Sequence, residues 1–412
     1  MNYNMIKVYK NCNNIKLTCY FIQSNQDSEL FSSSLLVKVG SLCDPKNKSG
    51  LAHYVEHMNM NFDKFNLEEM DGFMNCFAYT NYYATVYEMT SNSRKIEQSL
   101  IIIKNILNGN YLLEEKLEAV RKDIIKEWNR TNRMCKGLIS NALFHNSIYE
   151  EQAPLGNIND INSITFDDIK DFFAKWYVQQ NIELQIICSG EEKDVDSILK
   201  KQGFKESNSP FEPHQKWERE TDNFSFSEDT LVNIYTGNKY ENETRIFYKL
   251  SYIHLLKELG VDEKYYKCMC DIISDVLTLY LRDSIEAVNT SYIDFIDFSK
   301  DIVIMLINIK CKNWNHSGVD INNFLDGFGE WIKINLDSIK QQYFCAVKEK
   351  AETIEEVKLK LYSHFIFGRT FVELSDEQFF VNEQLSKINA NRLQEIVNSL
   401  LNNAQKKIVI IN

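Results

Sequence analysis

Two histidines and a glutamate stand close together at His53, Glu56 and His57, in the stretch His-Tyr-Val-Glu-His. Residues three or four apart share one face of a helix, so a helix here would place both imidazoles side by side. Two neutral imidazoles at this spacing can hold one Zn²⁺, and the carboxylate can take a proton from an attacking water. The stretch therefore predicts a metal site with a general base beside it.

Chance explains this pattern poorly. The chain has 7 histidines in 412 residues. Multiplying residue frequencies along the chain gives roughly 0.01 accidental matches to His-x-x-Glu-His. The other interpretation is that His53 and His57 are ordinary helix residues with satisfied hydrogen bonds.

A catalytic zinc ion usually has three protein ligands and one open position, so the two histidines need a third partner. A helix predicted at 112–133 offers Glu127, because Leu117, Val120 and Ile124 form an apolar seam that next reaches this glutamate. A carboxylate on an apolar face is costly unless it is paired or binds a metal. A salt bridge to a nearby Arg or Lys explains it equally well. Three rival carboxylates on this helix lie in more polar surroundings, typical of a solvated surface: Glu114, Glu115 and Glu118.

The elements that must position these residues alternate between strands and helices, and a similar order occurs twice. We expect an α+β fold of two homologous domains, each a mainly antiparallel sheet packed with helices. The second is a degenerate copy that lacks His-x-x-Glu-His. The first set comprises strands 33–39, 75–89 and 182–188, the motif helix after Gly50, and helices 93–108, 112–133 and 166–177. The second set comprises strands 245–251, 301–310 and 407–411 with helices 264–282 and 321–343.

Chain length also predicts two domains, because 412 residues exceed one compact core. The stretch 206–222 is polar, holds two of the four prolines and lacks steady periodicity, which is typical of a linker. We expect an N-terminal zinc-binding domain at 1–205, a linker at 206–222 and an inactive C-terminal domain at 223–412.

Composition excludes several classes of protein. The net charge is -12 and no block of basic residues occurs, which argues against a nucleic-acid partner. The ten cysteines lack the paired spacing of a disulfide scaffold or zinc ribbon, which favours reduced thiols. Met1–Lys10 has no apolar core of a secretory signal, and the longest apolar run, Ile302–Ile307, is too short to span a membrane. We therefore expect a cytoplasmic protein without a membrane span.

These residues resemble the pitrilysin, or insulinase, family of inverted zinc metallopeptidases, especially short-chain members similar to mitochondrial processing peptidase. The resemblance covers nearly the whole chain. The matching stretches are Val39-Gly40-Ser41, Ser49 to Met58, Asn75 with Thr85-Val86-Tyr87, and Pro154-Leu155-Gly156.

The resemblance implies roles for individual residues. His53, His57 and Glu127 would be the zinc ligands, Glu56 the general base, and Asn75 part of a substrate-binding edge strand. It implies a zinc endopeptidase that cuts short or unfolded peptides. Short-chain bacterial members also remove leaders from precursor peptides, so precursor processing is one implied activity. The alternative is a non-catalytic member that binds an active homologue, and a purely structural zinc protein ranks last.

The chain departs from the family pattern in its supporting residues. Val120 stands where the family often has a second glutamate. Arg282 matches the start of an Arg-Tyr pair that contacts the substrate carbonyl, but Asn289 occupies the tyrosine position and the nearest tyrosine is Tyr292. An equally good interpretation is that Arg282 caps its helix and Tyr292 packs in a strand. Because two such chains or halves enclose a chamber in the family, a homologous subunit is the expected partner, with a heterodimer favoured over a homodimer.

Overall fold

The computed structural model divides into two compact units. Unit 1 comprises Met1–Asn132, Asn146–Glu218 and Ala351–Gly368, and unit 2 comprises Arg133–His145, Arg219–Lys350 and Arg369–Asn412. The structure describes residues 5–13, 15–22, 30–60, 72–132, 139, 143–144, 147–189, 192–211, 226, 231–234, 242–284, 288–311, 325, 327–350, 352–383 and 385–411.

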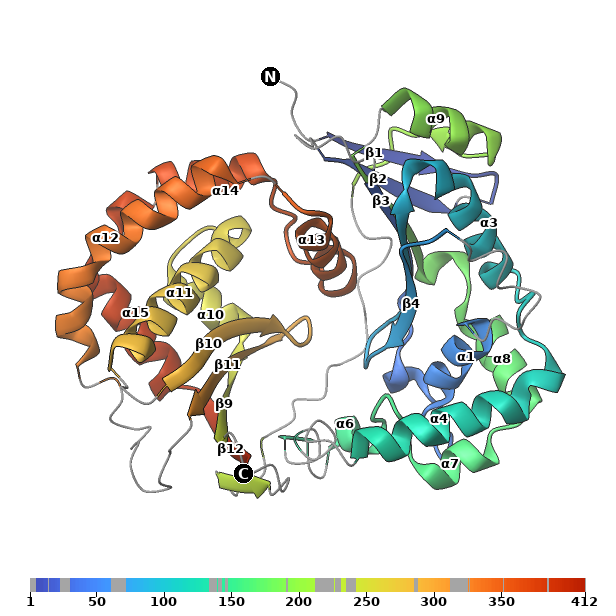
Figure 1. Ribbon diagram of the computed structural model, residues 1–412, viewed down its shortest axis with the longest axis horizontal. Coiled ribbons are helices and arrows are strands. Elements are labelled where there is room, and N and C mark those ends of the chain that lie inside the picture. Colours follow the sequence, from blue (N-terminus) through green and yellow to red (C-terminus); the bar gives the residue numbers. More distant parts are fainter. Residues whose placement is uncertain are drawn as a thin grey trace. The chain divides into compact units, whose positions relative to one another are not determined.

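Unit 1 is built on a mixed sheet with the strand order β4-β5-β3-β6-β2-β1-β7 (Figure 1). Every neighbouring pair is antiparallel except β2 and β6, which run parallel. The strands are β1 (Met5–Lys10), β2 (Lys16–Phe21), β3 (Leu30–Val37), β4 (Asn75–Thr80), β5 (Thr85–Asn92), β6 (Ile182–Cys188) and β7 (Lys205–Glu206).

The two faces of this sheet differ in chemistry. Leu35 and Leu184 belong to the apolar core, which the helices cover on one side. The alternate residues Glu183 and Gln185 are buried on the opposite face, where α13 (Ile354–Phe367) packs against β6 (Figure 1). The other helices of unit 1 are α1 (Leu51–Met60), α3 (Ile96–Leu107), α4 (Leu117–Asn132), α6 (Ile148–Glu151), α7 (Ile158–Ser163), α8 (Phe166–Trp176) and α9 (Glu192–Lys201), with 3₁₀ turns at Ser41–Cys43, Ser93–Lys95, Glu114–Lys116 and Gln179–Asn181.

Unit 2 repeats the arrangement with the strand order β10-β11-β9-β12-β8. This order matches β4-β5-β3-β6-β2, and β12 and β8 run parallel just as β6 and β2 do. The strands are β8 (Leu231–Ile234), β9 (Asn242–Ser251), β10 (Val288–Asp297), β11 (Ile302–Cys311) and β12 (Gln405–Ile411). The predicted α+β fold of two homologous domains is therefore confirmed.

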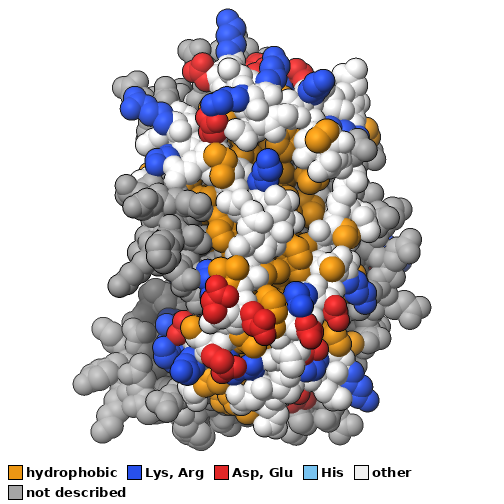
Figure 2. Space-filling view, turned by 90° about the vertical axis from the view of Figure 1, so that its right-hand side faces the viewer, with side chains coloured by type: hydrophobic (Ala, Val, Ile, Leu, Met, Phe, Trp, Pro, Cys, Tyr) orange, Lys and Arg blue, Asp and Glu red, His pale blue; other side chains and the backbone are white. Residues whose placement is uncertain are grey.

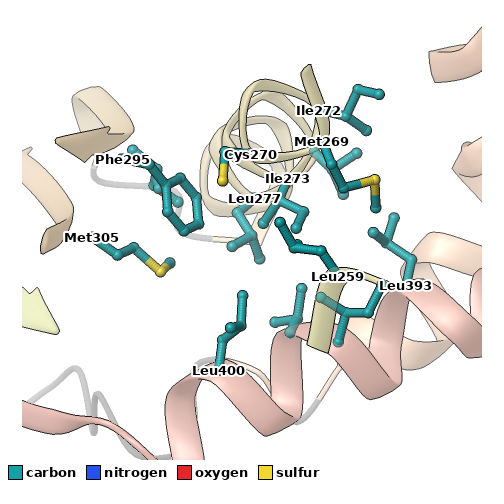
Figure 3. Close-up of a cluster of buried hydrophobic side chains, with 14 of the residues drawn as sticks. Leu259, Met269, Cys270, Ile272, Ile273, Leu277, Phe295, Met305, Leu393 and Leu400 are labelled. Carbon is teal, nitrogen blue, oxygen red and sulfur yellow. The ribbon is translucent and has the colours of Figure 1, made fainter. Parts of the chain in front are cut away.

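The core of unit 2 lies between this sheet and its helices. Figure 3 shows Leu277 and Ile273 directed toward Leu259 and Leu400, with Phe295 and Met305 contributed by the sheet. Cys270 lies in this cluster, as expected of a packed thiol. The helices are α10 (Tyr252–Leu259), α11 (Tyr266–Ser284), α12 (Phe328–Glu349), α14 (Leu374–Glu383) and α15 (Ala390–Asn402), with 3₁₀ turns at Glu263–Tyr265 and Leu385–Lys387.

Several element boundaries differ from the sequence prediction. The helix expected at 321–343 lies at Phe328–Glu349, and the stretch 75–89 forms two strands joined by a short turn. The segment 351–368, expected in the C-terminal domain, belongs to unit 1 because α13 covers the polar face of its sheet. The predicted linker 206–222 lies outside the described residues from 212 onward.

The surface carries both signs of charge. Figure 2 shows Asp and Glu side chains interspersed with Lys and Arg over the lower part of one face, with hydrophobic side chains exposed above them. Among the helices that the structure describes, none is long and apolar enough to cross a membrane.

Candidate metal centre

The helix that carries the two histidines begins at a buried carboxylate. Asp44 accepts hydrogen bonds from the backbone N–H groups of Gly50 at 2.7 Å and Ala52 at 2.8 Å. The first N–H groups of a helix lack intrahelical partners, and a carboxylate also stabilises the positive end of the helix dipole. Asp44 therefore fixes where α1 starts.

The Pro154-Leu155-Gly156 loop holds the beginning of α1 against α4. A β-carbon on Gly156 would lie 2.4 Å from the carbonyl oxygen of Ser49, so only glycine fits here. The same Gly156 accepts a hydrogen bond on its carbonyl oxygen from Trp128 Nε1 at 3.1 Å. Because Trp128 follows Glu127 on α4, this loop sets the distance between the two helices of the site.

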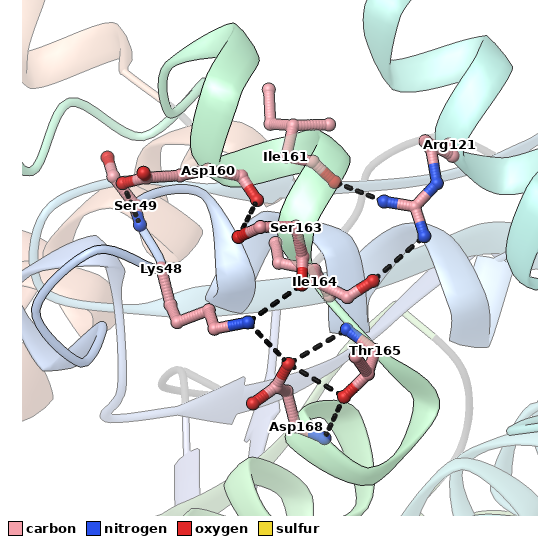
Figure 4. Close-up of polar contacts among 9 residues, drawn as sticks. All are labelled: Lys48, Ser49, Arg121, Asp160, Ile161, Ser163, Ile164, Thr165 and Asp168. Carbon is pink, nitrogen blue, oxygen red and sulfur yellow. Dashed lines mark hydrogen bonds and ion pairs between the residues drawn. The ribbon is translucent and has the colours of Figure 1, made fainter.

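A second group of polar contacts ties α4 to α7 and the loop before α1 to α8 (Figure 4). Arg121 donates to the carbonyl oxygens of Ile161 and Ile164. Its guanidinium lies 5.7 Å from the centre of the Tyr54 ring on α1. On the other side of α7, Lys48 bonds to Asp168 at 2.8 Å, which anchors the loop before α1. These contacts thus hold α4 through Arg121 and the start of α1 through Lys48.

These supports bring His53, His57 and Glu127 together. The Nε2 atoms of His53 and His57 lie 3.0 Å apart, and Glu127 Oε2 lies 3.2 Å from His57 Nε2 and 3.8 Å from His53 Nε2. Among the described residues, this is the group of His, Cys, Asp and Glu side chains whose geometry suits a metal ion.

The spacing of these atoms fits zinc. Zn–N and Zn–O bonds of about 2.0 to 2.2 Å at tetrahedral angles place ligand atoms about 3.3 Å apart. The three separations of 3.0, 3.2 and 3.8 Å scatter around that value. Two imidazoles and one carboxylate are also the donor set of a zinc site that leaves one position open.

Burial keeps the first histidine in the form that binds metal. His53 is 6% exposed, and burial together with the nearby His57 lowers the pKa of His53 to about 3. Burial also lowers the pKa of His57, but the Glu127 hydrogen bond and nearby carboxylates raise it overall. The hydrogen bond from His57 in turn lowers the pKa of Glu127. Among the described residues, His53 Nδ1 is buried without a hydrogen-bond partner.

Glu56 lies beside the three candidate ligands. Its Oε2 is 3.9 Å from His53 Nε2 and accepts a hydrogen bond from Thr80 Oγ1 at 2.9 Å. Burial raises the pKa of the Glu56 carboxyl to about 7. A carboxyl with a pKa near neutrality can both take up and release a proton, which is what a general base must do.

Glu127 lies where the apolar seam of α4 predicts. Val120 and Ile124 are buried in the core, and Glu127 is the next residue along that face. The side chain meets the two histidines, and Arg130 is also near enough to lower the pKa of Glu127. The rival glutamates 114, 115 and 118 are exposed. Val120 is fully buried among apolar side chains and offers no supporting carboxylate.

Three candidates remain. Asn75 is exposed at the start of β4, an edge strand of the unit 1 sheet in the described structure. Arg282 and Tyr292 belong to unit 2 and form separate contacts. Arg282 Nη2 donates to Ser291 O at 3.4 Å, whereas the Tyr292 hydroxyl accepts from Asn308 Nδ2 at 3.0 Å.

Two residues of the centre were missed by sequence reasoning. Asp44 lies in a polar loop six positions before Gly50, so no local pattern marks it as a cap. Thr80 lies in the predicted strand 75–89, but only the hairpin turns its hydroxyl toward Glu56. Side-chain alternation along β4 could have placed Thr80 on one face, without indicating what that face meets.

Comparison with known sequences matches the region that holds this centre. Residues 20–158 match the family model described as Insulinase (Peptidase family M16). A protein of Haemophilus influenzae named "Probable zinc protease PqqL" is 27% identical over 198 residues. That match covers 44% of this chain and 21% of the relative, so the matched segment spans about a fifth of its length.

Comparison with solved structures extends the likeness of fold to the whole chain. The first half of the periplasmic protease PqqL from Escherichia coli has a TM-score of 0.74 at 17% identity, covering 100% of this chain and 92% of that one. A peptidase M16 inactive domain from Pseudomonas fluorescens has a TM-score of 0.69 at 14% identity, covering 99% and 97%.

Proposed function

The chain belongs, through residues 20–158, to the insulinase family, peptidase family M16, and we propose that it is a zinc-dependent endopeptidase that cuts short or unfolded peptides. Zinc is the cofactor of this family's proteases. The observation that carries the proposal is the convergence of His53, His57 and Glu127 with Glu56 beside them. We assign the first three as ligands and Glu56 as the general base.

In the proposed reaction the bound metal and the protein side chains have separate roles. Bound zinc supplies Lewis-acid activation of the scissile carbonyl and of the attacking water. Glu56 takes the proton from that water on its carboxylate and passes it to the nitrogen of the leaving amine. The buried position of Glu56 keeps bulk water from competing for this proton. The peptide C–N bond breaks, and the products are a carboxylate and an amine.

The deciding experiment combines metal analysis with peptide cleavage. The purified chain should contain about one zinc per molecule and should cut a random peptide library, with cleavage lost on chelation and restored by zinc. Glu56→Gln should keep the zinc and lose cleavage by at least about 100-fold, the lower range of general-base contributions. Unchanged cleavage by Glu56→Gln would remove Glu56 from the mechanism.

The second candidate is a non-catalytic member that binds an active homologue. The Pseudomonas fluorescens domain, described as inactive, shares this fold over nearly its whole length. Val120 in place of a supporting carboxylate is consistent with it. This candidate predicts zinc-independent binding to the homologue and no cleavage at any zinc concentration, so the same assay separates the two.

Substrate binding would use the edge of the unit 1 sheet. β4 lies at the edge of the described sheet, so its outer backbone groups can pair with an extended peptide. Asn75 lies at the start of this strand. Asn75→Ala should raise KM for peptides with little change in kcat. Removal of a leader from a precursor peptide is the physiological reaction we propose, and leader peptides should then be cut faster than random sequences of equal length.

We also propose that a homologous subunit completes the enzyme, as a heterodimer in preference to a homodimer. The similar Escherichia coli structure is described as the first half of its protease, so a fold of this size is one half of that protein. Arg282 and Tyr292 would contact the substrate carbonyl, in this chain's site or the partner's. Light scattering of the chain alone and with a homologue encoded nearby tests the assembly. Full activity of an isolated monomer would contradict it.

Our last proposal is a cytoplasmic location. The ten cysteines lack the paired spacing of a disulfide scaffold, which suits a reducing compartment. Alkylation of intact protein taken from cells, followed by mass measurement, should find all ten cysteines reduced. Disulfide-linked peptides would contradict the proposal.

A further inference from the structure

The turn between β4 and β5 is fixed by one side chain. Asn81 Oδ1 accepts hydrogen bonds from the backbone N–H groups of Tyr83 at 2.8 Å and Ala84 at 2.9 Å. Its Nδ2 donates to the Tyr362 hydroxyl on α13 at 2.5 Å. A β-carbon on Gly40 would lie 2.2 Å from Asn81 O, so the turn also packs tightly against the end of β3. The backbone position of Thr80, the residue before Asn81, is therefore well fixed.

The Thr80 hydroxyl meets two oxygen atoms. Thr80 Oγ1 lies 2.9 Å from Glu56 Oε2 and 3.2 Å from Thr85 Oγ1. Thr85 Oγ1 donates to the carbonyl oxygen of Val39 at 2.9 Å. Because a carbonyl can only accept, the single hydrogen of Thr85 is committed to Val39. Thr85 Oγ1 can therefore only accept a hydrogen bond from Thr80.

The single hydrogen of Thr80 thus has two possible acceptors, Glu56 and Thr85. We propose that Thr80 is the positioning residue for Glu56, and that Thr85 is the alternative acceptor that lets Thr80 serve the carboxyl throughout the reaction. This inference rests on the proposed role of Glu56 as the general base. Thr80 does not touch the substrate; it acts by orienting the carboxyl group.

The hydrogen bonds balance before and after proton transfer. While Glu56 is a carboxylate, Thr80 donates its hydrogen to Glu56 Oε2. Once Glu56 has taken a proton, that proton is held for the leaving amine, and the Thr80 hydrogen is shared between Oε2 of the now neutral carboxyl and Thr85 Oγ1. The carboxyl keeps one hydrogen bond in either state, so its orientation need not change during turnover.

Both hydrogen-bond partners of Thr80 are buried. Glu56 is 5% exposed and Thr85 is 1% exposed, and the half-buried Thr80 lies between them, so little bulk water reaches the Glu56 carboxyl. A buried polar group that loses its partner is costly and tends to reorient. Loss of the Thr80 hydroxyl should therefore misdirect Glu56 without removing it.

The test compares Thr80→Val, Thr80→Ser and Thr85→Val in the zinc-loaded full chain, with Thr90→Val as the matched control on β5. Valine copies the shape of threonine without the hydroxyl, and serine keeps the hydroxyl. Thr80→Val should lower kcat by about 10- to 100-fold, the effect of misplacing a catalytic group by up to 1 Å, with KM within about twofold. Thr80→Ser should restore most of kcat. Thr85→Val should lower kcat by a smaller factor, and Thr90→Val should leave it unchanged.

A second readout does not depend on activity. Crystal structures of the zinc-loaded wild type and Thr80→Val should show the Glu56 carboxylate in one orientation in the former and displaced in the latter, with equal zinc content. Wild-type kcat in Thr80→Val, or a Thr80→Ser variant as slow as Thr80→Val, would overturn the inference. If the wild type itself does not cut peptides, the proposed function fails, and an unchanged Glu56 orientation would still overturn the role of Thr80.

Discussion

Gly156 lies directly against Gly50, the residue that precedes the helix of the two histidines. A β-carbon on Gly156 would come 2.8 Å from Gly50 Cα and 2.4 Å from Ser49 O. Both glycines have positive φ, at +91° for Gly50 and +68° for Gly156. The loop 154–156 and the start of α1 therefore lie too close to admit a side chain at Gly156, and Trp128 on α4 bonds to the same glycine.

Gly156→Ala should disturb the metal centre through this contact. The added methyl group must push the loop away from α1, and positive φ adds strain. We expect a loss of about 2 to 4 kcal/mol in the free energy of unfolding, the strain of one unfavourable backbone conformation plus an overpacked contact. Urea denaturation of the metal-free chain measures it.

Gly203→Ala is the matched control. Gly203 also has positive φ, at +84°, but nothing lies within 4 Å of the added β-carbon. This variant should lose only about 1 kcal/mol, the cost of the backbone conformation alone. Equal losses in the two variants would show that the contact between residues 156 and 50 adds nothing.

Glu127→Gln should weaken zinc binding while leaving the fold intact. The amide loses the negative charge that a third ligand brings beside the two histidines. Removing even an indirect support of a metal site costs about 10- to 100-fold in affinity, so removing a ligand should cost at least about 100-fold. Competition with a chromophoric chelator gives the affinity. Glu115→Gln, a change of the same type at an exposed glutamate in the turn before α4, is the control, and equal zinc affinity of both variants would exclude Glu127 as a ligand.

Glu56 should make the metal-free chain less stable as pH rises. Burial raises the pKa of Glu56 from 4.5 to about 7 in the folded state. A group whose folded pKa is raised favours folding below its unfolded pKa, and that contribution is lost as pH rises through the folded value. Between about pH 4.5 and 7 the loss should approach about 3 kcal/mol, taking 1.36 kcal/mol per unit as an upper limit.

Glu56→Gln isolates this effect. In the presence of a chelator, the free energy of unfolding of Glu56→Gln should fall less between pH 5 and pH 8 than that of the wild type, because glutamine does not titrate. Parallel profiles for the two proteins would show that Glu56 is not the titrating group.

The ion pair of Lys358 and Glu88 should hold α13 on the unit 1 sheet. Their side chains lie 2.8 Å apart and are 10% and 8% exposed. Lys358→Met leaves Glu88 buried without its cation, and breaking a buried pair from one side costs about 3 to 5 kcal/mol. Chemical denaturation measures this loss in the full chain.

The double variant Lys358→Met with Glu88→Gln provides the check. It removes both charges, so it should recover much of the stability lost by Lys358→Met alone. If the loss in the double variant equals the sum of the losses in Lys358→Met and Glu88→Gln measured separately, the pair has no coupling energy. In that case α13 is held by its other contacts, such as the hydrogen bond from Asn81 to Tyr362.

The sequence by itself determined the local chemistry. Spacing alone put His53, Glu56 and His57 on one helical turn, because a helix repeats every 3.6 residues. The seam through Val120 and Ile124 selected Glu127 for the same reason. The order of strands and helices was sufficient to predict two homologous α+β domains, since each element has its own hydrophobic period.

Only the tertiary structure decided what depends on contacts between distant segments. The approach of Gly156 to Gly50, the turn of Thr80 toward Glu56 and the packing of α13 on unit 1 join residues 24 to 281 positions apart. The helical and strand periods of the sequence cover only a few residues, so they do not predict contacts between segments this far apart. Arg282 and Tyr292 show the same limit. Tyr292 meets Asn308 through the register of β10 and β11, and Arg282 on α11 meets the backbone of Ser291 on β10, so neither contact follows from the spacing of the two residues.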